Sequence, residues 1–275
     1  MMIASMMAST LYRLVKTRMT WVFLGIYTAF IPIALGLVKL IGADSSLMLA
    51  TTQTSSEMAL TLSVTTPGVG GAQLDQLCGA MFVRGSMIAM FVAVFCGVFF
   101  ASDLRSGSVK NLIRSSHARL SYAVSAAATA GCVCVAYVAV GAAATAASAV
   151  ATGVALAVPN PASFLAWCAQ VAALTFAYSL LAVGVALLTR SLAASAVAGF
   201  LLGGAAVENL LYTALGLISG HPEEVRQLFD GYLAVIISQL GLGSVQSPEA
   251  LAPVVITIVA AIAASVGIMG RRSLG

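Results

Sequence analysis

Residues 99–119 of this chain read FFASDLRSGSVKNLIRSSHAR, a polar and basic stretch between two long apolar runs. It holds four of the thirteen lysines and arginines, namely Arg105, Lys110, Arg114 and Arg119. The residues on both sides of it are of the kind that partition into lipid. The stretch therefore marks a point where the chain leaves a membrane between two spans.

The composition fits a membrane protein throughout. The 275 residues are 60% hydrophobic and 8% charged, with a mean hydropathy of +1.03. A soluble domain has about 25% charged residues, so this chain cannot cover a globular surface with polar groups. Several runs of about 20 apolar residues predict an all-α polytopic membrane protein. The runs lack the alternation that is typical of a transmembrane barrel.

The apolar run at residues 120–158 has two interpretations. As one helix it would be about 58 Å long, nearly twice the hydrocarbon thickness, so it is either one long helix or a hairpin of two spans. With one span, ten of the thirteen lysines and arginines lie on one side of the membrane, together with both termini. A seventh span would move Arg190, Arg271 and Arg272 to the other side. The positive-inside rule therefore favours one span here.

We predict a single transmembrane domain over residues 1–275, with six helices at about 20–41, 78–101, 120–150, 163–188, 192–218 and 251–269. The charge bias predicts that both termini are cytoplasmic and that the chain lies in the cell membrane. Segment 102–119 is then a cytoplasmic connection between spans 2 and 3. Tight turns are expected at residues 159–161 and 189–191.

The N-terminal residues 7–19 form an amphipathic pattern. Apolar side chains recur at spacings of three and four, at Met7, Leu11, Leu14, Val15 and Met19. The basic residues Arg13, Lys16 and Arg18 occupy the other positions. This pattern predicts a helix that lies in the cytoplasmic interface, with its basic residues among anionic head groups. The alternative is a basic tail without regular structure.

Two further segments carry informative patterns. Residues 126–131 and 141–148 of the third span are dense in Ala, Gly, Ser and Thr. Small residues let helices approach closely in lipid, so we expect an interior helix. Residues 219–250 are external in this topology, yet many of them are apolar. We expect this segment to dip into the outer leaflet as a re-entrant or interfacial hairpin before span 6.

The sequence contains no motif for its own energy source or catalysis. It lacks a G-x-x-x-x-G-K-[ST] loop and an H-E-x-x-H pair, and it has only two histidines. Its five cysteines lie mostly in apolar runs, so we expect buried side chains rather than disulfides or metal ligands. The net charge of +4 is too small and dispersed to indicate nucleic acid. No catalytic, metal or directly bound cofactor site is predicted.

Glu208 is the acidic residue expected inside a span, and Asn209 follows it. Together they could form an intramembrane polar site. Glu208 could pair structurally with Asn209, Arg84 or Lys39 near the outer surface. Alternatively, it could carry protons in a proton-coupled secondary carrier.

Segment 102–119 contains a candidate docking helix. Ser108 suits the N-cap of a short helix that runs from Val109 to about Arg114. Its apolar positions are Val109, Leu112 and Ile113, with Leu104 upstream, and its flanking cations are Lys110 and Arg114. A short helix with one apolar face can dock into a groove on another protein. The alternative is an ordinary basic loop.

The run from Asp103 to Leu112, followed by Arg119-Leu120-Ser121-Tyr122, resembles the signature of the ABC-2 type transporter permeases. That family has an acidic residue, a Gly-Thr pair, a basic residue, apolar positions and then an Arg that starts the third span. Here Asp103 stands where Glu is usual, and Gly107-Ser108 stands where Gly-Thr is usual. The six-span layout with a basic N-terminal helix is also similar.

The resemblance implies a permease subunit of an ATP-binding cassette exporter for a peptide, drug or lipid-like substrate, as in antibiotic resistance. ATP and Mg²⁺ would be bound by separate ATPase subunits, so the permease itself would not be an enzyme. It would pair with a second permease protomer in the membrane lipid. The implied coupling residues are Asp103, Leu104, Gly107, Ser108, Val109, Lys110, Leu112, Ile113, Arg114 and Arg119. The other interpretations are the carrier that uses Glu208 and a non-transporting membrane scaffold.

Overall fold

The computed structural model describes residues 2–44, 72–106, 116–154, 156–157, 160–204, 207, 210–211, 214–215 and 232–271. Its helices are α1 (Met2–Lys16), α2 (Arg18–Asp44), α3 (Leu74–Cys78), the π-helical turn η1 (Gly79–Val83), α4 (Met87–Arg105), α5 (Ser116–Thr152), α6 (Pro161–Thr189), α7 (Leu192–Gly203), α10 (Leu233–Leu240) and α11 (Ala252–Arg271). Two short strands, β1 (Ala72–Gln73) and β2 (Leu156–Ala157), pair in parallel.

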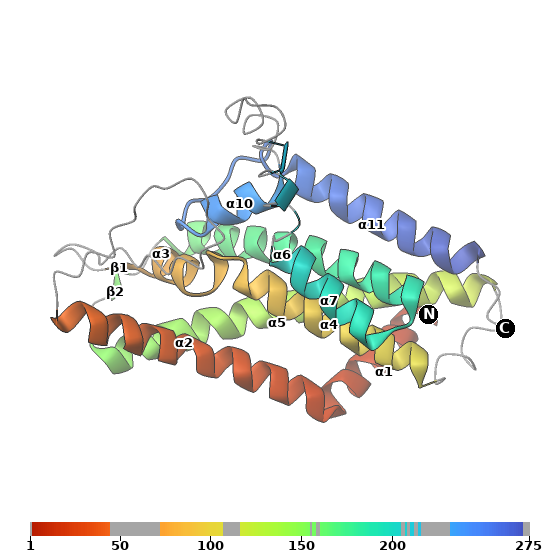
Figure 1. The fold of residues 1–275 in the computed structure, drawn as a ribbon, viewed down its shortest axis with the longest axis horizontal. Coiled ribbons are helices and arrows are strands. Elements are labelled where there is room, and N and C mark those ends of the chain that lie inside the picture. The colour runs from red at the N-terminus through yellow and green to blue at the C-terminus, as the bar shows by residue number, and fades with distance from the viewer. Residues whose placement is uncertain are drawn as a thin grey trace.

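The long helices form one elongated bundle (Figure 1). Within the described residues, five helices are long and apolar enough to cross a membrane: α2, α4, α5, α6 and α11. This finding confirms a helical, multi-pass chain. Helix α7 has 12 residues, and the described residues between 207 and 215 are also helical. The span expected at 192–218 is thus described only in part, and the sixth crossing stays a prediction.

The run at 120–158 forms one helix rather than a hairpin. Helix α5 continues without a break for 37 residues, which corresponds to about 55 Å. Its small residues Ala126, Ala130 and Ala149 are buried in the core, whereas Val135 and Val150 on another face are exposed. The expected interior location is therefore right for one face of the helix.

The predicted start of the second span is wrong. Instead of one helix over 78–101, the chain forms α3 and η1, turns at residues 84–86, and starts α4 at Met87. Gly85 and Ser86 both adopt left-handed backbone conformations, with φ of 80° and 59°. A helix cannot continue through two such residues, so Arg84 lies in the turn and not in the first turns of the span. The apolar residues on both sides concealed this break.

The expected N-terminal helix is present, although it runs from Met2 to Lys16 and ends at a corner before α2. Two side chains donate hydrogen bonds to carbonyls in the last turn of α1. The Thr17 hydroxyl donates to the Arg13 carbonyl (2.7 Å), and the Trp21 ring nitrogen donates to the Val15 carbonyl (2.9 Å). Among its apolar positions, Leu14 is buried against the bundle, whereas Val15 is exposed.

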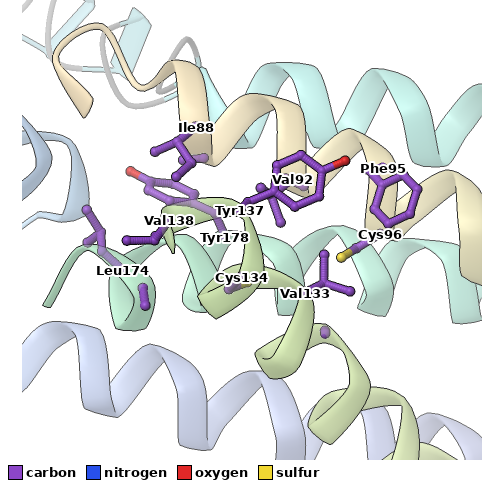
Figure 2. Close-up of a cluster of buried hydrophobic side chains, with 14 of the residues drawn as sticks. Ile88, Val92, Phe95, Cys96, Val133, Cys134, Tyr137, Val138, Leu174 and Tyr178 are labelled. Atoms are coloured by element: carbon purple, nitrogen blue, oxygen red, sulfur yellow. The ribbon is translucent and has the colours of Figure 1, made fainter. Parts of the chain in front are cut away.

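Helix α4 forms the centre of the bundle, where it contacts α5, α6 and α7 (Figure 1). Figure 2 shows the buried side chains that fill the space between α4, α5 and α6. The set comprises Ile88, Val92, Phe95 and Cys96 from α4, Val133, Cys134, Tyr137 and Val138 from α5, and Leu174 and Tyr178 from α6. A larger share of α4 is buried than of any other candidate span that the structure describes.

Glycines permit the close contact between α4 and the antiparallel α7. A Cβ atom on Gly199 would lie 2.7 Å from the Cα of Val94, and one on Gly203 would lie 2.7 Å from the Cα of Met90. A Cβ on Gly97 would lie 3.0 Å from the Ser195 carbonyl oxygen. Gly199 and Gly203 form a G-x-x-x-G pattern, which supports backbone approach between helices in lipid.

The short helices cover the end of the bundle opposite α1 (Figure 1). Helix α10 packs on α6 and η1, and the Trp167 ring nitrogen donates to the Leu240 carbonyl (2.9 Å). The Gln170 side chain forms two hydrogen bonds of 2.9 Å with the backbone of Gln246. The apolar segment before the last span is therefore packed from residue 233 onward, while residues 219–231 lie outside the described residues.

Enlarging the glycines of α7 tests the α4–α7 contact. We expect Gly199→Ala or Gly203→Ala to destabilise the chain by about 1–3 kcal/mol, because the added methyl group meets the backbone of α4. The measurement is the thermal unfolding midpoint of the purified chain in detergent. Gly25→Ala in α2 is the matched control, since a Cβ there meets open space. Equal midpoints for Gly199→Ala and Gly25→Ala would contradict the contact.

Candidate functional site

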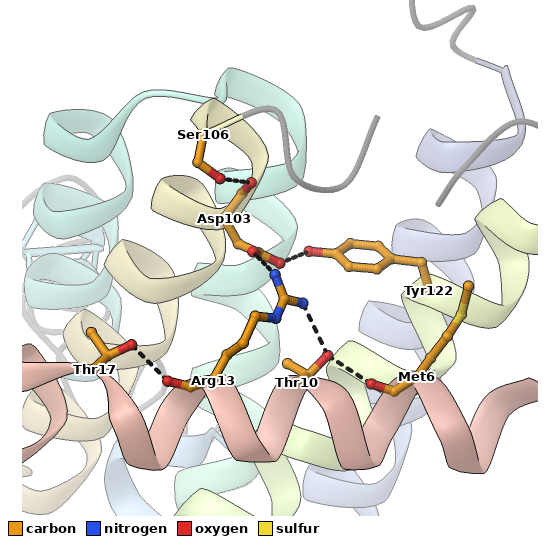
Figure 3. Close-up of polar contacts among 7 residues, drawn as sticks. All are labelled: Met6, Thr10, Arg13, Thr17, Asp103, Ser106 and Tyr122. Carbon is orange, nitrogen blue, oxygen red and sulfur yellow. Dashed lines mark hydrogen bonds and ion pairs between the residues drawn. The ribbon is translucent and has the colours of Figure 1, made fainter. Parts of the chain in front are cut away.

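Three polar side chains meet where α1 crosses the ends of α4 and α5 (Figure 3). We call Arg13, Asp103 and Tyr122 the polar junction. The Arg13 guanidinium forms an ion pair with one carboxylate oxygen of Asp103. The Tyr122 hydroxyl donates to the other oxygen at 3.1 Å. The junction thereby connects α1, α4 and α5 through one carboxylate.

The local sequence places each partner. Asp103 lies in the last turn of α4, and Tyr122 lies in the second turn of α5. Asp103 lies at the start of segment 102–119, and Tyr122 lies just after its end. On α1, the Thr10 hydroxyl donates to the Met6 carbonyl (2.9 Å) and lies 3.5 Å from the Arg13 guanidinium. Thr10 thus helps to hold Arg13 in the direction of Asp103.

Burial makes the pairing of Asp103 important. Its side chain is 9% exposed, while that of Arg13 is 32% exposed. A carboxylate with so little contact with water is unfavourable unless a cation and hydrogen-bond donors compensate its charge. Both of its oxygens have such a partner here. The ion pair is therefore a structural link between α1 and α4.

An open groove lies beside the polar junction. Its volume is about 390 Å³, and it is lined by Tyr12, Arg13, Lys16, Thr17, Met19, Phe99, Ser102, Asp103 and Ser106. The lining residues come from α1, from the start of α2 and from the last turns of α4. The groove combines cations and hydroxyl groups with the apolar side chains of Met19 and Phe99.

The structure places only part of the predicted coupling set. Leu104 is half-buried and packs against the core, and the Asp103 carboxylate faces Arg13 and Tyr122 within the chain. The predicted residues outside the described residues are Gly107, Ser108, Val109, Lys110, Leu112, Ile113 and Arg114. For Arg119, only the backbone within α5 is described. Glu208 and Asn209, the possible intramembrane site, also lie outside the described residues.

The sequence analysis missed the roles of Arg13 and Tyr122. Arg13 was expected among lipid head groups, and Tyr122 appeared only as part of a motif. An acidic residue at the end of an apolar run indicates that a cation lies nearby. Arg13 and Arg105 could both supply that cation. The sequence alone does not show whether the partner of Asp103 lies 90 residues away or in the same helical turn.

The described ranges contain no group of three or more His, Cys, Asp or Glu side chains that could hold a metal ion. The polar junction consists of one cation, one carboxylate and one phenol, an arrangement suited to holding helices together.

No family model and no curated protein matches this chain.

Removing the cation tests the polar junction. We expect Arg13→Gln to destabilise the chain by about 1–3 kcal/mol, because the buried Asp103 carboxylate would lose its cationic partner. This range lies between the values typical of exposed and of buried ion pairs. The exchange Arg13→Asp with Asp103→Arg should recover part of the loss. The measurement is thermal unfolding in detergent.

Arg105→Gln is the matched control, because this exposed arginine lies on the last turn of the same helix as Asp103. We expect it to change stability by less than about 0.5 kcal/mol. If Arg13→Gln and Arg105→Gln have the same effect, the ion pair does not hold α1 to the bundle.

Proposed function

We propose that this chain is the membrane-spanning permease subunit of an ATP-binding cassette exporter. The observation that carries the proposal is the polar junction at the two ends of segment 102–119. Helix α4 ends at Arg105 and α5 begins at Ser116, and both ends are linked to α1 through Asp103. A partner that moves this segment would therefore move three helices together.

The energy for transport would come from separate ATPase subunits, which would bind ATP and Mg²⁺. The sequence has no phosphate-binding loop of its own. The stripe formed by Val109, Leu112 and Ile113 would dock into a groove on the ATPase, and Lys110 and Arg114 would pair with its acidic groups. A second permease protomer, identical or related, would complete the substrate path for a peptide, drug or lipid-like molecule.

Charge placement supports a cytoplasmic location for this end of the bundle. The end of the bundle that α1 crosses also holds the start of α2, the last turn of α4 and the turn between α6 and α7. These elements carry Arg13, Lys16, Arg18, Arg105 and Arg190. The turn before α4, which carries Arg84, lies at the opposite end. Cytoplasmic connections carry more lysine and arginine than external ones. Helix α1 would then lie in the cytoplasmic interface, and α10 would lie on the outer side.

Affinity purification of the tagged chain from native membranes tests the proposal. We expect an ATPase with a phosphate-binding loop to copurify, with a mass of 25–35 kDa implied by the family resemblance. A chain that copurifies with no ATPase under conditions that preserve membrane complexes would contradict the proposal.

Substitutions in segment 102–119 locate the contact. We expect Lys110→Glu with Arg114→Glu, or Leu112→Asp alone, to lower ATPase copurification at least about tenfold, because a contact of that kind is worth more than about 1.4 kcal/mol. Membrane insertion should stay normal. Arg190→Glu is the matched control, because it reverses a charge at the same end of the bundle outside the segment. Normal copurification by Leu112→Asp would exclude the segment as the docking site.

A further inference from the structure

The groove beside the polar junction has an excess of positive charge. Arg13 and Lys16 line it, and the exposed Arg18 and Arg105 adjoin lining residues, while Asp103 is its acidic residue. Four cations against one carboxylate leave a local charge of +3. The Asp103 carboxylate already has Arg13 and Tyr122 as partners, so it repels an incoming anion weakly.

Lys16 lines the groove and is available to a ligand. Its ammonium lies 5.8 Å from the ring centre of Tyr12 and has no acidic partner in the part of the chain that the structure describes. The side chain is exposed. The ring holds the ammonium at the groove without neutralising it, so an anion there gains a charge interaction at little desolvation cost.

The hydroxyl groups of the groove divide into two kinds. Thr17 and Ser106 donate their hydrogens to the carbonyls of Arg13 and Asp103 (Figure 3), so their oxygens can only accept. Ser102 is exposed and, among the described residues, has no such acceptor, so it can donate. The groove thus offers a cation and a donor for a phosphate, and acceptors for a ligand hydroxyl group.

Two candidate membrane spans end at the groove. The candidate spans Arg18–Leu37 and Met87–Arg105 both have an end at its edge. Trp21 is 61% exposed and donates to the carbonyl of Val15, the neighbour of Lys16, and exposed tryptophan is typical of the membrane–water interface. On α2, Val22 and Ile26 lie about one and two turns beyond the lining residue Met19, and both are exposed apolar side chains.

We propose that this groove binds the head group of an anionic phospholipid, with phosphatidylglycerol the best match. The phosphodiester contacts Lys16 and Ser102, and the glycerol hydroxyl groups donate to Thr17 and Ser106. An acyl chain follows the exposed apolar face of α2. The bound lipid bridges the corner between α1 and α2 and the end of α4, and therefore stabilises the polar junction. This binding does not depend on an ATPase partner.

Lipid retention by the purified chain tests the proposal. The full chain is placed in nanodiscs made either of phosphatidylcholine alone or of equal parts of phosphatidylcholine and phosphatidylglycerol. Lipids that stay bound after transfer to detergent are counted by native mass spectrometry. We expect phosphatidylglycerol to be retained in preference to phosphatidylcholine, and Lys16→Gln to weaken this retention about fivefold, the effect of one basic residue at an anionic surface. Lys16→Arg should retain the lipid.

Arg190→Gln is the matched control, since it removes a cation from the same end of the bundle away from the groove. An equal loss in Arg190→Gln and Lys16→Gln would show unspecific attraction and overturn the site, as would unchanged retention by Lys16→Gln. Thermal unfolding in phosphatidylcholine alone should be the same for all variants, because Lys16 is exposed. If soluble glycerol phosphate displaces the lipid completely at equal concentration, the groove binds a free phosphate and the lipid proposal is wrong.

Discussion

The close contact between α4 and α7 is the constraint on which the rest of the bundle depends. In lipid, apolar helices gain little from contacting each other instead of acyl chains, so association relies on tight packing. Gly199 and Gly203 bring the two backbones together, and Gly97 on α4 accommodates α7 from the other side. Helix α4 also packs against α5 and α6. Together these contacts fix the position of its last turn, which carries Asp103.

The polar junction extends this constraint to the end of the bundle. Asp103 lies on α4, which has the largest buried share of the candidate spans that the structure describes. It binds Arg13 of α1 through an ion pair and Tyr122 of α5 through a hydrogen bond. The ion pair and the hydrogen bond of Asp103 therefore lie where segment 102–119 leaves α4 and where the chain enters α5. The proposed coupling to a separate ATPase would need such a rigid link, because a flexible end would absorb the movement of the partner.

The sequence predicted the features that depend on local patterns. It indicated the helical membrane class, the single long helix α5, the N-terminal helix and the turn at 189–191, where Ser191 caps α7. It missed features that need tertiary contacts or backbone geometry. The break at Gly85 and Ser86 lies within an apolar run, which conceals it. The G-x-x-x-G pattern of α7 indicates a close helix contact but not which helix makes it. Arg13 pairs with a carboxylate 90 residues away.

The most direct measurement of the central claim is photocrosslinking from position 112 in native membranes. A photoreactive amino acid in place of Leu112 should form a covalent adduct with an ATPase subunit, because the docking helix would bury this side chain in the partner. The same amino acid in place of Val197 on the exposed face of α7 should not form that adduct. Adducts from position 112 with lipid or with a second copy of this chain alone would contradict the account.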